Sequence, residues 1–164
     1  MDHISPQQRS QLMSRIRGKD TKPEMTLRRA LHALGYRYRV HQRGLPGQPD
    51  IVFARRKKVI WVHGCFWHWH DETSCSIAKL PKSRTEFWEA KFLRNRQRDQ
   101  RQAREMEALG WSAMIVWECQ LASSHLKDTL AKVEKFLGEP SLAKPKRGQT
   151  GVRTPARLAP SKGS

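Results

Sequence analysis

The sequence predicts an α/β fold in which a mixed sheet has helices on both of its faces. Short apolar segments typical of strands alternate with longer amphipathic segments, in the order helix, helix, three strands, helix, strand, helix. Val59–His63 is almost continuously apolar, which indicates a strand covered on both faces and therefore central in the sheet. Helical layers around a sheet bury both kinds of apolar face. The length of 164 residues fits one domain with one hydrophobic core.

Two helices are expected before the first strand. Ser5–Pro6 offers an N-cap followed by a proline in the first turn, so a short helix is predicted from there to about Ile16. A second helix opens at Thr21 and ends before Gly35. Its expected buried face carries apolar residues three or four positions apart, namely Leu27, Ala30, Leu31 and Leu34.

Three strand segments follow, joined by short turns. Tyr36–His41 alternates aromatic or apolar residues with basic ones and is interpreted as a strand. Leu45–Pro49 is a turn, and Asp50–Phe53 is a second short strand. Arg55–Lys58 is predicted to form the tip of a hairpin that leads into the central strand.

The next segments combine an irregular insert with a long helix. Gly64–Arg84 is an insert without helical or strand periodicity, and it holds Cys65, Cys75 and several histidines. Thr85–Leu109 is predicted as one long helix with an arginine-rich exterior. Ser112–Trp117 is apolar and forms the fourth predicted strand.

The chain is expected to end in a helix and a tail. Ser123 or Ser124 is the predicted N-cap of the last helix, which ends near Leu137. Residues 139–164 are rich in Pro, Lys, Gly, Ser and Thr without periodicity, so we expect a basic, disordered tail. The predicted organisation is one folded domain over residues 1–138 and the tail over residues 139–164.

The net charge indicates a polyanionic partner. Thirty-two Lys and Arg residues stand against 15 Asp and Glu residues, a net charge of +17. Residues 139–164 carry +5 of it, so the predicted domain is itself basic at +12, which favours nucleic acid over a merely solvated surface. A membrane surface fits less well, because the charge is not gathered on one amphipathic face. Without an apolar spanning run or a signal region, a cytoplasmic, nucleoid-associated location is expected.

Two neighbouring strands bring a carboxylate and a histidine to one edge of the predicted sheet. Pro49–Asp50 opens one strand and His63 ends the next. A carboxylate in this position can hold Mg²⁺, which takes oxygen ligands and activates water near a phosphate. Taken alone, a Pro-Asp pair is more often an ordinary turn.

The cysteines predict a metal site rather than a disulfide framework, because there are only three of them. Cys65, Cys75 and Cys119 with His70 form a set of three thiolates and one imidazole that is typical of structural zinc. The spacing is not that of a common zinc finger, so unrelated buried thiols are the alternative.

The strand that begins at Asp50 resembles the core of the PD-(D/E)XK nucleases. In that core the following strand carries a second acidic residue and a lysine, whereas Ile60–His63 contains neither. The lysine-assisted mechanism therefore cannot operate from this strand, and histidine chemistry has to replace it.

Four longer motifs resemble those of the very short patch repair (Vsr) endonucleases in order and spacing. They are Leu45–Asp50, His63–His68, Arg84–Trp88 and Val116–Cys119. The resemblance runs over residues 9–137, and its most specific part is the His-Gly-Cys-Phe-Trp-His run at positions 63–68. It implies a restriction-endonuclease-like mixed sheet flanked by helices, with a structural zinc site.

The resemblance implies five catalytic side chains: Glu24, Asp50, His63, His68 and Asp99. Asp50 would bind Mg²⁺ together with the backbone carbonyl of Val62, and Glu24 would help to hold water around the metal. His68 would be the general base, oriented by Asp99, because a histidine titrates near neutral pH. His63 would lie near the scissile phosphate.

The resemblance also implies the zinc ligands Cys65, His70, Cys75 and Cys119. This sequence departs from better-known relatives here. The segment between His70 and Cys75 is longer, and Trp69 stands where a histidine is common.

Four further side chains would enter the base stack beside a mismatch: Met13, Phe66, Trp67 and Trp88. Unstacking costs a few kcal/mol per base step and less at a mismatched pair, which is a physical basis for selection. Plain core packing is the alternative for Trp88.

The resemblance, added to these features, implies a magnesium-dependent DNA endonuclease that nicks a duplex 5′ of the thymine in a T:G mismatch. Such mismatches arise when 5-methylcytosine deaminates, so a DNA cytosine methyltransferase is the implied biological partner. A monomer suffices for a single nick. The alternatives are a restriction-type nuclease on the same core, which cuts both strands, and a non-catalytic zinc-containing DNA-binding protein.

Overall fold

A four-stranded mixed sheet forms the centre of the protein. The computed structural model describes residue 7 and residues 18–140, and the predicted first helix lies outside them except for residue 7. The sheet order is β1-β2-β3-β4, with strands β1 (Arg39–Val40), β2 (Ile51–Phe53), β3 (Lys58–His63) and β4 (Ser112–Trp117). β1 and β3 both pair antiparallel with β2, whereas β3 and β4 are parallel. The apolar segment expected at the centre is β3, which has neighbours on both sides.

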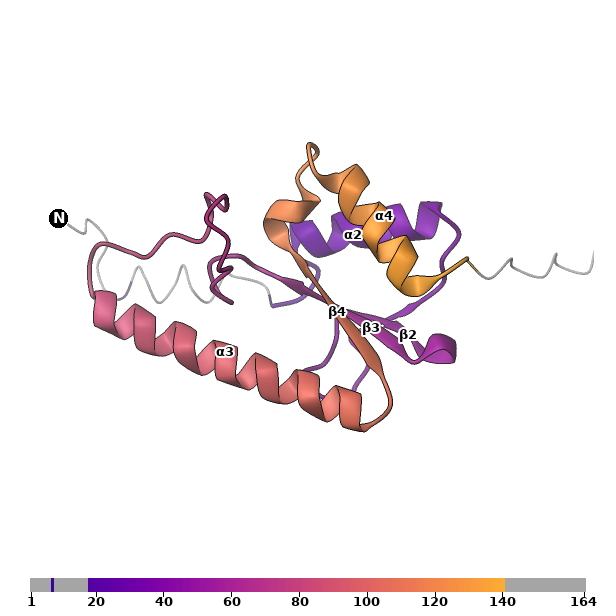
Figure 1. Ribbon diagram of the computed structural model, residues 1–164, viewed down its shortest axis with the longest axis horizontal. Coiled ribbons are helices and arrows are strands. Elements are labelled where there is room, and N and C mark those ends of the chain that lie inside the picture. Colours follow the sequence, from indigo (N-terminus) through magenta and orange to yellow (C-terminus); the bar gives the residue numbers. More distant parts are fainter. Residues whose placement is uncertain (1–6, 8–17, 141–164) are drawn as a thin grey trace, which may run out of the picture.

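Helices cover both faces of this sheet, as predicted. Figure 1 shows α2 (Lys22–Ala33) and α4 (Leu126–Leu137) together on one face and α3 (Thr85–Ala108) on the other. The first face packs a core that includes Leu27 and Leu31 from α2 and Val133 and Leu137 from α4. On the opposite face, the alternate strand side chains Val52, Val59 and Trp61 pack against Met106 of α3.

Local signals set the ends of α2. Thr21 is the N-cap, and its side chain accepts a hydrogen bond of 3.4 Å from the backbone N–H of Glu24. Pro23 fits the first turn, where its missing N–H costs nothing. After the helix, Gly35 adopts φ +92°, a left-handed conformation that residues with a Cβ rarely take.

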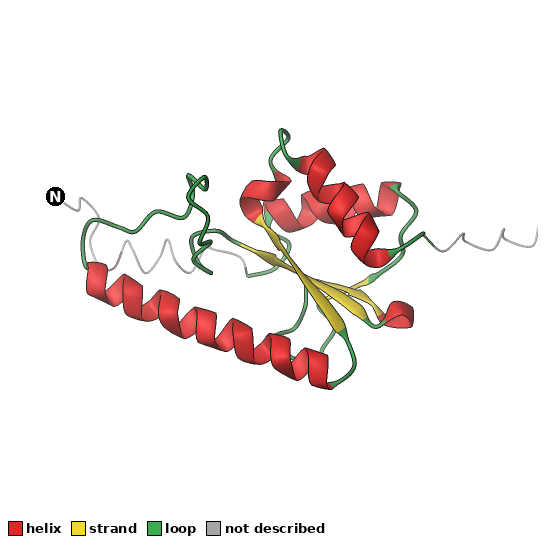
Figure 2. Ribbon diagram, viewed as in Figure 1, coloured by secondary structure: helices red, strands yellow, loops and turns green. Residues whose placement is uncertain are grey.

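The long helix α3 is mostly solvated. Only Trp88, Phe92 and Met106 are buried among its 24 residues, all of which the structure describes. Its C-terminal part packs on the sheet, while its N-terminal part lies along the insert that follows β3 (Figure 2). The helix therefore leaves an exposed, arginine-rich surface.

No helix in the described part of the chain is long and apolar enough to cross a membrane.

Three local predictions need correction in their details, although the predicted hairpin between β2 and β3 is confirmed. β1 contains only Arg39–Val40 of the expected strand, because Tyr36 and Tyr38 are bonded into the helical layer: their hydroxyls donate to Gly138 O at 2.7 Å and Arg28 O at 2.6 Å. Ala54–Arg56 is a 3₁₀ turn, and Lys58 already belongs to β3. The last helix has His125 as its N-cap, without a side-chain cap bond, rather than a serine.

The sheet topology gathers the predicted site residues at one edge. Parallel pairing sets Val62 opposite Val116 and His63 opposite Trp117, so the segments that follow β3 and β4 emerge side by side. β2 runs the other way, with Ile51 opposite Ile60, so the residue before β2 lies at this edge as well. Asp50, the insert after His63 and the turn that holds Cys119 therefore meet there.

Candidate active site and cysteine-histidine cluster

A cleft of about 530 Å³ opens at this edge of the sheet. Five of the predicted site residues line it: Asp50, Val62, His63, His68 and Asp99. They come from the start of β2, the end of β3, the insert and the middle of α3. The sixth predicted residue, Glu24, is 1 % exposed and contributes no surface to the cleft.

Asp50 is held at the cleft by β3. The backbone N–H of Val62 donates to Oδ2 of Asp50 over 2.7 Å. Burial, together with the nearby Glu24 carboxylate, raises the pKa of Asp50 to about 6 against the pull of that bond. A half-buried carboxylate at the edge of an open cleft fits a site for a divalent cation.

The turn before Asp50 depends on a glycine. Gln48 N–H donates to Leu45 O over 3.2 Å, which closes the turn, and Gly47 adopts φ +68°. A Cβ at Gly47 would lie 2.8 Å from Oε1 of Gln102 and 3.2 Å from the Trp61 ring. The left-handed backbone conformation therefore favours glycine at this position, and a Cβ would also displace the end of the Gln102 side chain and crowd the Trp61 ring.

His68 and Asp99 form the arrangement of a base and its orienting carboxylate. Nδ1 of His68 lies 2.6 Å from Oδ2 of Asp99. A carboxylate partner requires the proton on Nδ1, so Nε2 is the nitrogen that can accept a proton. Burial alone would raise the pKa of Asp99, but the hydrogen bond from His68 and the Arg98 guanidinium hold it below its ordinary value.

His63 stacks on His68 and stays neutral. The two rings are 3.8 Å apart at 13°, and His63 also meets the Trp117 ring edge-on at 5.4 Å. Burial is the main reason that the pKa of His63 is lowered to about 3. A neutral imidazole beside the base can donate or accept a hydrogen bond without adding charge.

Glu24 belongs to a buried ionic cluster behind the cleft. Its Oε1 lies 3.1 Å from Nη1 of Arg28 and 3.1 Å from Nε2 of His41. Arg28 also reaches Oδ1 of Asp20 over 2.6 Å. Glu24 is thus fixed near enough to Asp50 to act on the charge of that carboxylate.

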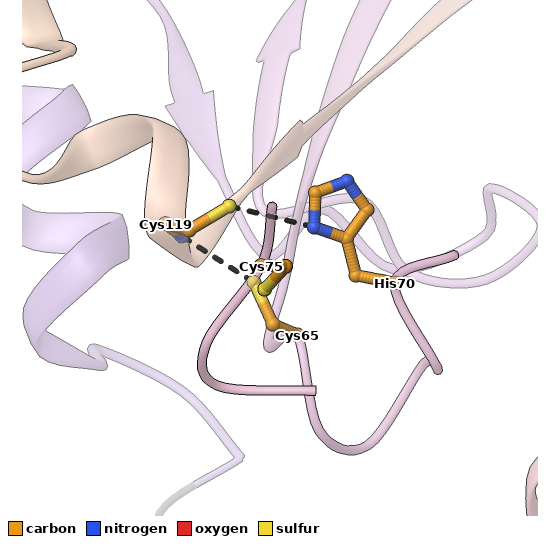
Figure 3. A group of neighbouring side chains, drawn as sticks. All are labelled: Cys65, His70, Cys75 and Cys119. Carbon is orange, nitrogen blue, oxygen red and sulfur yellow. Dashed lines mark hydrogen bonds between the residues drawn. The ribbon is translucent and has the colours of Figure 1, made fainter. Parts of the chain in front are cut away.

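The three cysteines and His70 converge on one point (Figure 3). Their donor atoms all lie within 4.8 Å of one another, and Nδ1 of His70 is 3.4 Å from Sγ of Cys119. Tetrahedral zinc with Zn–S bonds near 2.3 Å requires sulfurs about 3.8 Å apart, so this set fits the ion. The longer segment between His70 and Cys75 does not prevent Cys75 from reaching the other donors.

Trp117 joins this cluster to the cleft. His70 stacks on one side of the indole with ring centroids 4.2 Å apart, and His63 meets the same indole edge-on. The second ring nitrogen of His70, Nε2, lies 3.2 Å from the Glu72 carboxylate. Carboxylates often orient metal-binding histidines in this way.

The comparisons with known proteins agree with the geometry of the cleft. A family model described as DNA mismatch endonuclease Vsr matches residues 1–74. The type II nicking enzyme V.XorIIP of Xanthomonas oryzae is 49 % identical over 121 residues, which are 74 % of this chain and 87 % of that protein. The DNA mismatch endonuclease Vsr of Escherichia coli K12 is 43 % identical over 113 residues, 69 % of this chain and 70 % of that protein. This chain belongs to the Vsr family. It is therefore a DNA endonuclease.

The predicted wedge residues of this Vsr-family chain form one aromatic cluster. Phe66 contacts Trp67 and Trp88 edge-on, with ring centroids 5.1 and 5.2 Å away. The ammonium group of Lys91 lies over Trp67 at 5.2 Å and over Trp88 at 5.5 Å. Trp88 is buried at 9 % exposure, so it forms the base of the cluster, while Phe66 and Trp67 are half-buried. Met13 lies outside the described residues.

The Vsr-family cleft also contains residues that sequence reasoning missed: Lys19, His41, Arg98 and Gln102. Arg98 precedes the predicted Asp99 in the sequence. This neighbour is the only feature of the sequence that distinguishes Arg98 from the other arginines of α3. Trp69 was noted only as a departure from the usual histidine. It adopts φ +50° and stacks on Phe92 at 5.0 Å, in the turn that sends His68 to the cleft and His70 to the cysteines.

Proposed function

We propose that this chain nicks double-stranded DNA 5′ of the thymine in a T:G mismatch, in a reaction that depends on Mg²⁺. The observation that carries the proposal is the meeting, in one cleft, of the half-buried Asp50 carboxylate with the His68–Asp99 pair. The first suits a divalent cation and the second suits a general base, and phosphodiester hydrolysis uses both.

The residues of the cleft have distinct tasks in this reaction. Asp50 and the Val62 carbonyl would hold Mg²⁺, and the bound ion would polarise the scissile phosphate. Glu24, which was expected to hold water around the ion, instead lies buried behind the cleft and acts on the charge of Asp50. His68 takes a proton from the attacking water at Nε2 while Nδ1 keeps its proton toward Asp99. The water oxygen bonds to phosphorus as the bond to the leaving strand oxygen breaks, and that oxygen takes a proton from solvent. His63 lies beside the phosphate.

The aromatic cluster supplies the selection for a mismatch. Phe66 and Trp67 enter the base stack from the insert, supported by Trp88, while Met13 enters from the opposite side. A T:G pair is less costly to unstack than a matched pair, so the wedge favours it. T:G pairs come from deaminated 5-methylcytosine, so we expect the enzyme to work at the nucleoid in cells that have a DNA cytosine methyltransferase. A single nick needs one active site, so we expect a monomer.

A structural zinc ion completes the proposal. Cys65, His70, Cys75 and Cys119 would bind it and fix the insert that carries His68 and the wedge. Such a loop has little apolar core of its own, and structural zinc in small domains contributes on the order of ten kcal/mol.

The test is a nicking assay on a labelled duplex with one T:G mismatch, beside its T:A counterpart, with and without added Mg²⁺. We expect one Mg²⁺-dependent nick in the thymine strand of the mismatched duplex only. Asp50→Ala should abolish it, whereas Asp128→Ala, an exposed aspartate on α4, should not. Equal cutting of both duplexes would indicate a restriction-type nuclease. Binding without cutting would indicate a non-catalytic DNA-binding protein.

A further inference from the structure

The cleft lacks the lysine that the PD-(D/E)XK core places beside the phosphate. The strand that would carry it, β3, reads Lys58-Val59-Ile60-Trp61-Val62-His63, and only its last three residues line the cleft. Phosphoryl transfer develops negative charge on the oxygens around phosphorus, and catalysis relies on fixed positive charge at those oxygens. A permanent cation elsewhere in the cleft would add to the charge that a bound metal ion supplies. Among the described residues that line the cleft, only Lys19 and Arg98 carry one.

Arg98 is fixed in place, and Lys19 is not. Nε and Nη2 of Arg98 donate to Oδ1 of Asp99 over 3.3 and 3.0 Å. The other oxygen of the same carboxylate, Oδ2, binds the base His68. Lys19 is exposed and forms no ion pair with any described residue, so it is a hydrated point charge at the rim.

Arg98 still has donors for a ligand. A guanidinium carries five N–H groups, and the contacts with Asp99 use two of them. Its side chain is 44 % exposed and lines the cleft, so the remaining N–H groups are accessible there. The guanidinium lines the same cleft as Asp50, His63 and His68.

We propose that Arg98 is a catalytic residue that donates hydrogen bonds to a non-bridging oxygen of the scissile DNA phosphate while its other edge holds Asp99. Arg98 takes the place of the absent lysine but approaches from helix α3 instead of strand β3. The bidentate fork of arginine suits a phosphate oxygen and a carboxylate at the same time. This inference rests on the proposed nuclease function.

The first test compares single-turnover nicking of the T:G duplex by three variants. Arg98→Gln should lower the rate by about 10²–10³-fold, the usual effect of losing one donor to transition-state charge. Arg98→Lys should recover part of the rate, because it restores charge without the fork. Arg101→Gln removes an equal charge from the same helix outside the cleft and should leave the rate within about threefold, since surface charges contribute little.

DNA binding, measured with Ca²⁺ in place of Mg²⁺, separates catalysis from affinity. Binding of the T:G duplex should fall by a similar, small factor in Arg98→Gln and Arg101→Gln, because each loses one phosphate-attracting charge. A loss of binding in Arg98→Gln as large as its loss of rate would overturn the catalytic role. Thermal unfolding of each variant shows whether the fold is intact.

A double-mutant cycle distinguishes contact with the phosphate from an action through Asp99 alone. If Arg98 touches the phosphate, Arg98→Gln slows nicking further when added to Asp99→Asn. If Arg98 only positions Asp99, the double variant nicks as slowly as Asp99→Asn, and the proposal is overturned. A wild-type protein that cuts no duplex overturns the proposed function as well. A wild-type protein that nicks, with Arg98→Gln equally fast, overturns this inference alone.

Discussion

A single residue, Trp117, connects the two chemical centres of the protein. Its indole stacks on His70 and meets His63 edge-on, and the ring of His63 lies on His68, the proposed base. Trp117 therefore supports His68 through His63 and does not itself line the cleft. Because each of these contacts is between rigid rings, a change in how His70 is held is passed on to the cleft by packing.

Asp50 lowers the stability of the fold in the absence of metal. Burial raises the pKa of this carboxyl group from 3.8 to about 6 in the folded state. Below pH 3.8 the group is protonated in both the folded and the unfolded state. As the pH rises through 6, ionising the buried group costs free energy, so the free energy of unfolding falls. We expect Asp50→Asn, which keeps an acceptor for the Val62 N–H, to raise the free energy of unfolding by about 2 kcal/mol at pH 7.5. At pH 4 the change should be close to zero.

The measurement is denaturant unfolding in magnesium-free buffer at both pH values. Asp128→Asn, on the outer surface of α4, serves as the control and should change the free energy of unfolding by less than about 0.5 kcal/mol at either pH. A variant less stable than the wild type at pH 7.5 would show that the carboxylate is stabilised where it lies. The same variant should be inactive in nicking. Asp50 would then be a residue that lowers the stability of the fold but is required for activity.

Among the elements, the turn before β2 can be tested with a pair of glycines. Gly44 and Gly47 both have left-handed φ values, +88° and +68°, but a Cβ at Gly44 meets nothing within 4 Å, whereas one at Gly47 meets Gln102 and Trp61. Each alanine variant should lose about 1 kcal/mol of stability from backbone strain. Only Gly47→Ala should also slow nicking, because relieving the contact moves the turn that carries Asp50.

Unfolding and nicking rates of the two variants check this expectation. Gly47→Ala combined with Gln102→Ala should nick faster than Gly47→Ala alone, since the shorter side chain leaves room for the methyl group. Equal nicking by Gly44→Ala and Gly47→Ala would mean that the turn does not set the position of Asp50.

The insert after β3 is the element that we expect to depend on a metal ion. We expect about one zinc per purified chain by elemental analysis, because four donors of the right kind converge. Cys119→Ser should lose the zinc, expose the insert to protease and slow nicking through the movement of His68. Glu72→Gln leaves all four donors in place and should only weaken zinc binding, by about 10–100-fold, as changes to orienting partners do. Full zinc retention in Cys119→Ser would exclude this ligand set.

How much of each element the sequence predicts depends on where its signals lie. Thr21, Gly35 and Gly110 are local signals, and the helix ends that they indicate agree with the structure to within two residues. The short β1 could not be foreseen, because the hydroxyls of Tyr36 and Tyr38 bind partners that are distant in sequence or on another element.

The candidate site shows the same division. Asp50, His63 and the cysteines lie at strand ends or in motifs, so strand order and the resemblance place them together. Arg98 is one of five arginines in α3, and no spacing in the sequence tells which of them turns toward the cleft. The contact of His41 with Glu24 likewise depends on φ +46° at His41, a conformation without a sequence signal.

For the whole molecule, charge is the property that matters most for binding DNA. Of the net charge of +17, residues 139–164 carry +5 in a segment outside the predicted domain. Basic residues outside the cleft contact phosphates without regard to base sequence, so they contribute to affinity for any duplex. The domain, with its cleft and aromatic cluster, has to provide the preference for a mismatch.

Deleting residues 139–164 should therefore weaken binding without changing selectivity. The tail has six basic residues: Lys144, Lys146, Arg147, Arg153, Arg157 and Lys162. Each phosphate contact that is lost releases about 0.9 fewer counterions, so the slope of log K against log salt should fall in magnitude by up to about 5. The effect should be equal on T:G and T:A duplexes. Changing the six residues to Gln in the full-length chain should reproduce it, because charge and not length is responsible. An unchanged slope would mean that the tail does not bind phosphates. A loss of affinity confined to the T:G duplex would mean that the tail itself recognises the mismatch.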